Sequence, residues 1–182
     1  MDSIDLAHLE RRARRVYEFQ RLWRALLGVM PVLVVAAVAA LFTHRPISAL
    51  GFGLATVALG VAMLWYGRNP QKAVLPGVAA GLVPLVLALC ANHLHACGRD
   101  VCTSVCVPAC TAGGLIAGLA VANVGLRRTA GVWFWLPASS LALLTGAMGC
   151  ACIGYSGVWG LSLGIGIGLV LGQARRVLRA KR

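Results

Sequence analysis

The stretch at residues 73–91 reads AVLPGVAAGLVPLVLALCA and contains no charged side chain in nineteen positions. A bilayer hydrocarbon core about 30 Å thick is crossed by a helix of about 20 mostly apolar residues, so this stretch is predicted to span a membrane. The whole chain has the same character, because 59% of its 182 residues are hydrophobic and only 12% are charged. With a mean hydropathy of +0.82, this is the composition of a protein whose solvent is lipid.

Five further apolar stretches of similar length lie between clusters of charged and polar residues. Because they are continuous runs rather than short alternating segments, they favour helices over the strands of a membrane barrel. We therefore expect an all-α, polytopic membrane protein, with a six-helix transmembrane bundle at residues 25–174. The predicted spans are residues 25–43, 47–66, 73–91, 107–126, 130–149 and 157–174.

Lysine and arginine are distributed unevenly between the two sides of this predicted bundle. Fifteen of the 17 lie in the N-terminal segment 1–24, the second and fourth loops and the tail 175–182, whereas the other loops hold only Arg45 and Arg99. Positive charge near span ends tends to stay in the cytoplasm, so both termini are predicted to be cytoplasmic, in the bacterial inner membrane. The same side chains suit anionic lipid head groups, so the net charge of +12 does not require direct nucleic-acid binding.

Glycines recur at intervals of four residues in three of the predicted spans. Small residues at this spacing let helices approach closely in a membrane, where lipid supplies no hydrophobic drive for association. We expect these stripes to pack inside the bundle, with a homo-oligomer interface as the alternative. They are Gly77 and Gly81, then Gly114 and Gly118, then Gly160, Gly164, Gly168 and Gly172.

The predicted spans carry no Asp, Glu, Lys, Arg or His near their middle. Ion-coupled transporters and proton pumps usually need such groups within the membrane, so the pattern argues against both. The chain also lacks a nucleophile elbow, a phosphate-binding glycine loop and a metalloprotease His-Glu pair. We therefore do not expect an enzyme.

All seven cysteines fall on the predicted outer side of the membrane, in Cys-rich loops at residues 90–110 and 150–156. If the chain is helical from Cys102 onward, Cys102, Cys106 and Cys110 share one helix face. The candidate disulfide or sensing residues are Cys90, Cys97, Cys102, Cys106, Cys110, Cys150 and Cys152.

Three interpretations of this cluster stay open. Structural disulfides are expected where the compartment is oxidising, although an odd number leaves at least one thiol free or paired between molecules. Redox sensing would use a subset of thiols that switches between reduced and oxidised forms. Soft-metal binding would use thiolate and imidazole ligands. The metal ligands would be His93, His95, Cys97 and Cys102.

The N-terminal segment 1–24 is predicted to form an amphipathic cytoplasmic helix. Its apolar residues follow a spacing of three and four, and arginines occupy the opposite side. Such a helix lies on the membrane surface, continues the first span as a stalk, or presents its face to a partner protein. The residues we expect at a partner contact are Leu6, Leu9, Val16 and Tyr17.

The second half of the chain combines several short features in a fixed order. A basic turn at Leu126-Arg127-Arg128 is followed by a small-residue span, a short loop with Cys150 and Cys152, then Val158-Trp159 and a glycine-rich last span. In these features, over residues 100–175, and in its predicted topology, the chain resembles the six-span membrane anti-sigma factors of the NrsF type.

This resemblance implies a function and two sets of residues. In that family a short cytoplasmic N-terminal region holds an extracytoplasmic-function sigma factor at the membrane, and cysteines in the outer loops after the third and fifth spans are associated with sensing. By this resemblance, one of Cys102, Cys106 and Cys110 would act with one of Cys150 and Cys152.

We therefore expect a membrane-embedded regulator of transcription, an anti-sigma factor that releases its sigma factor when the outer cysteines sense oxidant or soft metal. Two alternatives remain at this stage. One is a thiol-based protein of heavy-metal transport or resistance, although the chain has no cysteine on its predicted cytoplasmic face. The other is a membrane thiol oxidoreductase, although no CxxC pair is present.

Overall fold

The computed structural model describes residues 3–42, 46–66, 68–94, 101–127, 131–150 and 154–180. Over these ranges all the regular structure is helical, which confirms the predicted all-α fold. The helices are α1 Ser3–Phe42, α2 Pro46–Tyr66, α3 Arg68–Leu94, α4 Val101–Arg127, α5 Val132–Cys150 and α6 Tyr155–Ala180.

Five of these helices, namely α1, α2, α3, α4 and α6, are long and apolar enough to cross a membrane. These are the properties of a helical membrane protein, as the composition predicted. The remaining predicted stretch, residues 130–149, forms α5, which has 19 residues and is not among those five.

Helix α5 is enclosed by the rest of the bundle. It packs against every other helix of the described chain, and none of its residues from Pro137 to Cys150 is exposed. Two of its hydroxyls are satisfied within the helix, since Ser139 donates to the Trp135 carbonyl at 2.8 Å and Ser140 donates to the Leu136 carbonyl at 2.7 Å. A helix shielded by protein in this way has little need of a lipid-like surface.

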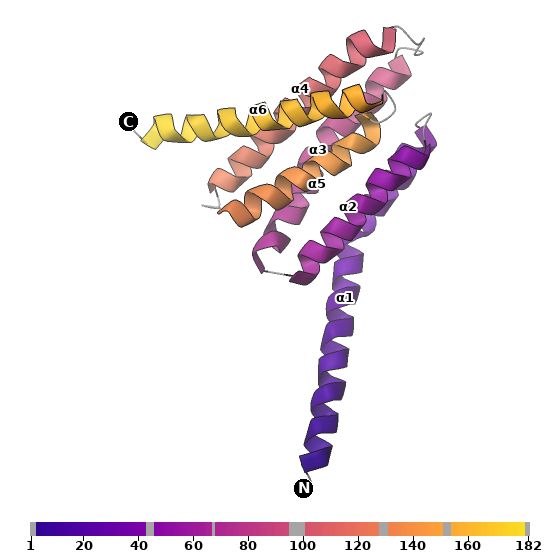
Figure 1. Ribbon diagram of the computed structural model, residues 1–182, viewed down its shortest axis with the longest axis vertical. Coiled ribbons are helices and arrows are strands. Elements are labelled where there is room, and N and C mark those ends of the chain that lie inside the picture. The colour runs from indigo at the N-terminus through magenta and orange to yellow at the C-terminus, as the bar shows by residue number, and fades with distance from the viewer. Residues whose placement is uncertain are drawn as a thin grey trace.

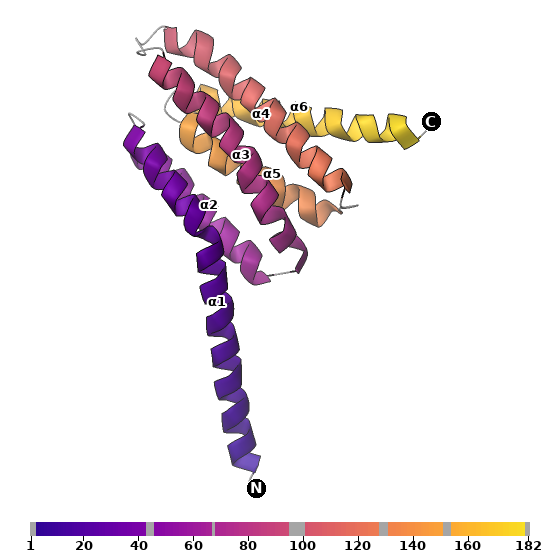
Figure 2. The same cartoon turned by 180° about the vertical axis from the view of Figure 1, so that it is seen from behind.

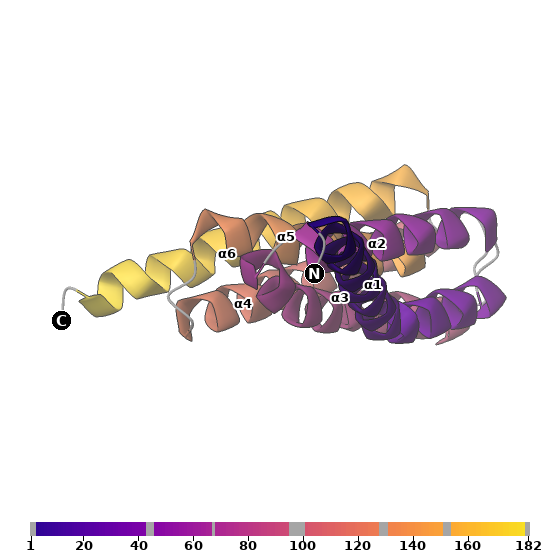
Figure 3. The ribbon, with the colours of Figure 1, turned by 90° about the horizontal axis from the view of Figure 1, so that it is seen from below.

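Seen from below, the helices form two layers, with α1, α3 and α4 in one and α2, α5 and α6 in the other (Figure 3). The principal contacts between the layers join α4 to α6, α3 to α5 and α1 to α2. The C-terminal ends of α1, α3 and α5 and the N-terminal ends of α2, α4 and α6 gather at one end of the bundle, which we call the cysteine end (Figures 1 and 2).

Glycine allows α4 and α6 to meet backbone against backbone. A Cβ built on Gly168 would lie 2.5 Å from the Leu115 carbonyl oxygen, and one on Gly160 would lie 2.9 Å from the Thr111 hydroxyl. Gly118 on α4 is equally tight against α6, because its Cβ would lie 3.0 Å from the Gly168 Cα. The glycine stripe of the last span therefore packs inside the bundle, as predicted.

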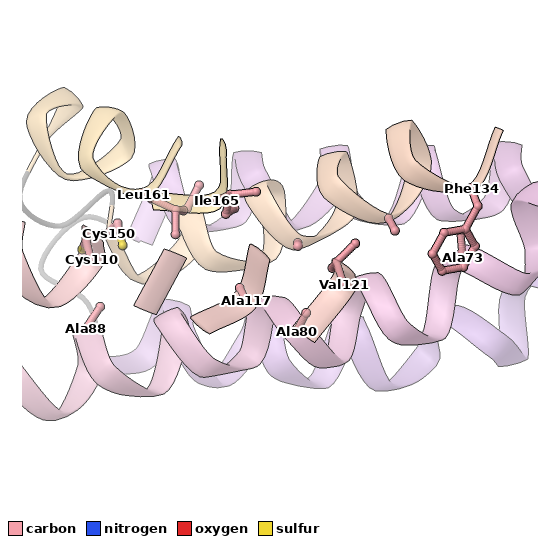
Figure 4. Close-up of a cluster of buried hydrophobic side chains, with 13 residues drawn as sticks. Ala73, Ala80, Ala88, Cys110, Ala117, Val121, Phe134, Cys150, Leu161 and Ile165 are labelled. Atoms are coloured by element: carbon pink, nitrogen blue, oxygen red, sulfur yellow. The ribbon is translucent and has the colours of Figure 1, made fainter. Parts of the chain in front are cut away.

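The α3–α5 interface repeats this arrangement. A Cβ on Gly77 would lie 2.8 Å from the Ala138 carbonyl oxygen, and one on Gly81 would lie 2.7 Å from the Ala142 carbonyl oxygen. The core between the helices is correspondingly built from small side chains, with larger ones at intervals (Figure 4). Its labelled members are Ala73, Ala80, Ala88, Cys110, Ala117, Val121, Phe134, Cys150, Leu161 and Ile165.

Helix α1 runs without a break for 40 residues, and its N-terminal half projects well beyond the bundle (Figure 1). Its side chains become buried from Ala25 onward, where Val29 and Val32 also face the bundle. Residues 3–24 thus continue the first span as a stalk, which was one of the three predicted arrangements.

Candidate functional site

The predicted outer loop at residues 90–110 is mostly helical in the structure. Cys90 lies near the end of α3, which continues to Leu94, and α4 begins at Val101. Helices continue past a stretch of apolar sequence when their backbone groups still find intrahelical hydrogen bonds. Cys102, Cys106 and Cys110 therefore all belong to α4, so the condition under which they would share one helix face is met.

The cysteines differ in exposure along these helices. Cys90 is exposed, whereas Cys106, Cys110 and Cys150 are buried. Cys97, Cys152 and His95 lie outside the described residues. Cys102 and His93 lie on described helices, but their side chains are outside the described part.

The structure brings Cys110 of α4 together with Cys150 of α5. Their side chains are joined by a hydrogen bond, and both residues are 0% exposed. Figure 4 shows the two thiols side by side at one end of the small-residue core. This thiol pair combines one member from each of the two cysteine sets that the family resemblance implies.

Two local features of the sequence place these thiols. On α4, Cys106 and Cys110 are four residues apart and both are buried, at 2% and 0% exposure, so they occupy the same inward face of the helix. On α5, Cys150 is the last helical residue. The chain then returns as α6, whose Gly157 packs against the Cys150 backbone, since a Cβ there would lie 2.6 Å from the Cys150 carbonyl oxygen.

Gly149, the residue before Cys150, brings α5 into close contact with α3 beside the thiol pair. A Cβ on Gly149 would lie 3.1 Å from the Ala88 Cβ and 3.0 Å from a Leu85 methyl group of α3. Helices α3, α4, α5 and α6 therefore all come close at the cysteine end. Sequence analysis did not identify Gly149 or Gly157 as part of the site, although glycines flanking a cysteine at a predicted span end were a usable signal.

Two thiols in hydrogen-bonding contact have a defined chemistry. A disulfide needs a sulfur–sulfur bond of about 2.05 Å and Cβ atoms about 3.5–4.5 Å apart, so neighbouring buried thiols on two helices need little movement to be linked. The two side chains are in hydrogen-bonding contact. The arrangement is that of a dithiol able to form a cross-link between α4 and α5.

Among the described side chains, no three His, Cys, Asp or Glu residues are grouped closely enough to hold a metal ion. The predicted soft-metal site at His93, His95, Cys97 and Cys102 lies outside those side chains. Metal binding there stays a prediction.

The predicted partner surface lies on the stalk of α1. Val16 is 53% exposed and Tyr17 is 65% exposed, while the side chains of Leu6 and Leu9 lie outside the described part. Sequence analysis missed Phe19, which is also exposed and stacks on Trp23 with ring centroids 6.4 Å apart. Their separation by four residues on a helix was the available signal.

Comparison with family models, with curated proteins and with solved structures finds no match to this chain.

Proposed function

We propose that this protein is a six-span membrane regulator of the bacterial inner membrane, in which oxidation of the Cys110–Cys150 pair changes the state of a cytoplasmic surface on α1. The partner held by that surface is an extracytoplasmic-function sigma factor, so the protein acts as an anti-sigma factor. The observation that carries the proposal is the contact between two buried thiols on different helices.

The six-span topology is part of this proposal. Helix α5 is supported as a span by its contacts with every other helix and by the absence of exposed residues from Pro137 to Cys150. With six spans both termini lie on one side, where the positive-inside rule places the arginine-rich ends in the cytoplasm. The cysteine end then faces the outer compartment.

A route from the thiol pair to α1 is supported by the packing of Met148. This residue lies two positions before Cys150 on α5 and is 0% exposed. It belongs to the same apolar cluster as Val29, Val32 and Ala36 of α1. A cross-link that shifts the end of α5 therefore acts on the side chains that hold α1 in the bundle.

The energetic requirement on this coupling is modest. Oxidation can shift the equilibrium between two helix packings only if the disulfide has a lower free energy in one packing than in the other. The size of the shift equals that difference in free energy. Coupling free energies of about 1–3 kcal/mol are typical for linked sites. A change of this size at the α1–α5 contact is enough to alter partner affinity about 5–150-fold.

The assignment of a sigma factor rests on the family resemblance, supported by a stalk with exposed apolar and aromatic side chains. Val16, Tyr17 and Phe19 are exposed on a helix that extends beyond the bundle. An apolar helix face of this kind suits insertion into a groove of a partner protein.

The test is a capture experiment in the bacterium that encodes the protein. The full chain is tagged at its C-terminus, and cross-linked partners are identified by mass spectrometry before and after oxidant. We expect a sigma factor in the reduced sample and its loss on oxidation, with Cys110→Ser retaining the partner under oxidant. Cys90→Ser is the matched control and should respond like the parent chain, since Cys90 is exposed and lies outside the pair.

Two results together would end the anti-sigma proposal. One is the absence of any sigma factor from the captured proteins. The other is unchanged gene expression after residues 3–22 are deleted, because this deletion removes most of the α1 stalk while leaving the buried side chains from Ala25 onward in place.

A further inference from the structure

The surroundings of the thiol pair restrict which molecules reach it, an inference that builds on the redox role proposed above. Cys110 and Cys150 are each 0% exposed, and Cys106, one helical turn from Cys110, is 2% exposed. The residues that share their cluster are apolar, among them Ala88 and Leu161. Both sulfur atoms are therefore covered by packed helices.

Exchange with an external disulfide places a strict demand on access. The attacking thiolate, the disulfide sulfur that it attacks and the leaving sulfur take part in one transition state, so the incoming molecule must reach the protein sulfur itself. Glutathione disulfide and the disulfides of oxidoreductase proteins are large and charged. They reach a fully covered sulfur only when the helices open locally.

A small uncharged oxidant needs a much smaller opening between the helices. It partitions into apolar protein without carrying charge out of water, which would be costly. We propose that the Cys110–Cys150 pair is oxidised directly by a peroxide of the size of hydrogen peroxide, and that it is shielded from thiol–disulfide exchange.

The reaction balances with the pair and one peroxide molecule. One cysteine, as its thiolate, attacks a peroxide oxygen, the O–O bond breaks, and the products are a sulfenic acid and one water. The second thiol attacks the sulfenic sulfur, the S–S bond forms, and the hydroxyl group leaves with a proton as a second water. Two thiols are oxidised by two electrons in total, and the peroxide is reduced to two waters.

Cys90 provides an internal comparison within the same chain. It lies near the cysteine end on α3, one residue before the end of the candidate span Gln71–Ala91, and it is exposed, so it is not covered by the other helices. Reagents that depend on access should modify Cys90 and leave the pair reduced. A small peroxide should link the pair faster than those reagents do, because it needs a much smaller opening.

The experiment uses the full chain in membrane vesicles, treated separately with hydrogen peroxide and with glutathione disulfide. Free thiols are then alkylated and the cysteine-containing peptides are quantified by mass spectrometry. We expect peroxide to form the Cys110–Cys150 disulfide, and glutathione disulfide to form it at least about tenfold more slowly while it modifies Cys90. Cys150→Ser should abolish the cross-link and leave the modification of Cys90 unchanged.

Either of two outcomes would overturn the inference. One is a pair that glutathione disulfide oxidises as fast as peroxide does, and the other is a pair that stays reduced in peroxide. Because this readout is chemical and needs no partner, it is separate from the capture of a sigma factor. A cross-link that forms in peroxide without release of a partner would contradict the proposed function and leave the oxidant preference standing.

Discussion

Gly118 of α4 and Gly168 of α6 lie in direct backbone contact, since a Cβ on Gly118 would be 3.0 Å from the Gly168 Cα. In lipid, where apolar burial does not drive helices together, close packing stabilises their association because it brings many weakly attractive atoms into contact. The α4 backbone therefore holds Cys110 in a fixed position relative to α6, while Cys150 depends on the end of α5.

Replacement of Gly168 by alanine should destabilise the bundle. The new Cβ would lie 2.5 Å from the Leu115 carbonyl oxygen, and overpacking of this kind costs about 1–3 kcal/mol. Gly166→Ala is the matched control on the same helix, because a Cβ at Gly166 meets no atom within 4 Å. Unfolding in detergent, followed by circular dichroism, should show a lower midpoint for Gly168→Ala alone. Equal midpoints for the two variants would contradict the backbone contact.

Thr145 offers a substitution that should stabilise the protein. Its hydroxyl is buried at 0% exposure and has no hydrogen-bond partner among the described residues. A buried unsatisfied polar group costs about 1–3 kcal/mol, and valine has nearly the same shape. Thr145→Val should therefore raise the unfolding free energy by about 1 kcal/mol.

Thr56→Val is the matched comparison for that substitution. Thr56 is also buried, at 1% exposure, but it donates a hydrogen bond of 2.8 Å to the Phe52 carbonyl. Valine there should be neutral or slightly destabilising. An equal change in the unfolding free energy of both valine variants would contradict the prediction that the unsatisfied Thr145 hydroxyl destabilises the protein.

Gly157→Ala should expose the thiol pair. Its Cβ would lie 2.6 Å from the Cys150 carbonyl oxygen, so α6 must move away from the end of α5. We expect faster labelling of Cys150 by a maleimide reagent, read by mass spectrometry. Gly51→Ala should leave the labelling rate unchanged, because a Cβ at Gly51 meets nothing within 4 Å. A rate unaffected by Gly157→Ala would show that α6 does not cover Cys150.

The six-span topology predicts that both ends of the chain lie in the cytoplasm. Reporter domains that are active on one side of the membrane only, fused before Ser3 and after Ala180, should report the same side. If α5 lay on the surface instead of crossing, the two reporters would disagree. Deletion of Val132–Cys150 should move the C-terminal reporter to the opposite side.

The fold class follows from the sequence because each apolar run must be about as long as the bilayer is thick. The stretch at 73–91 lies within α3 as expected, but α3 begins at Arg68 and ends at Leu94. Helix ends extend beyond the apolar run because hydrogen bonding continues where hydrophobicity stops. For that reason the sequence predicts a loop at the Cys-rich region 90–110, although most of this region is helical.

The candidate site could be predicted only in part. Helical spacing places Cys106 and Cys110 on one face, and both are buried. The helix that this face contacts depends on how α4 packs against α5. The spacing of residues within α4 does not determine that packing. The family resemblance implied two sets of cysteines, and among the described side chains Cys110 and Cys150 are members of those sets that lie in contact.

The shielding of α5 also has a consequence for how the protein is made. Membrane insertion depends on the surroundings that a segment meets as it leaves the translocation machinery, and in the finished bundle no residue of α5 from Pro137 to Cys150 is exposed. When α5 emerges, α3 has already been synthesised, and its Gly77 and Gly81 offer the surface on which Ala138 and Ala142 pack. The order of the helices along the chain thus makes the packing surface for α5 before α5 itself is synthesised.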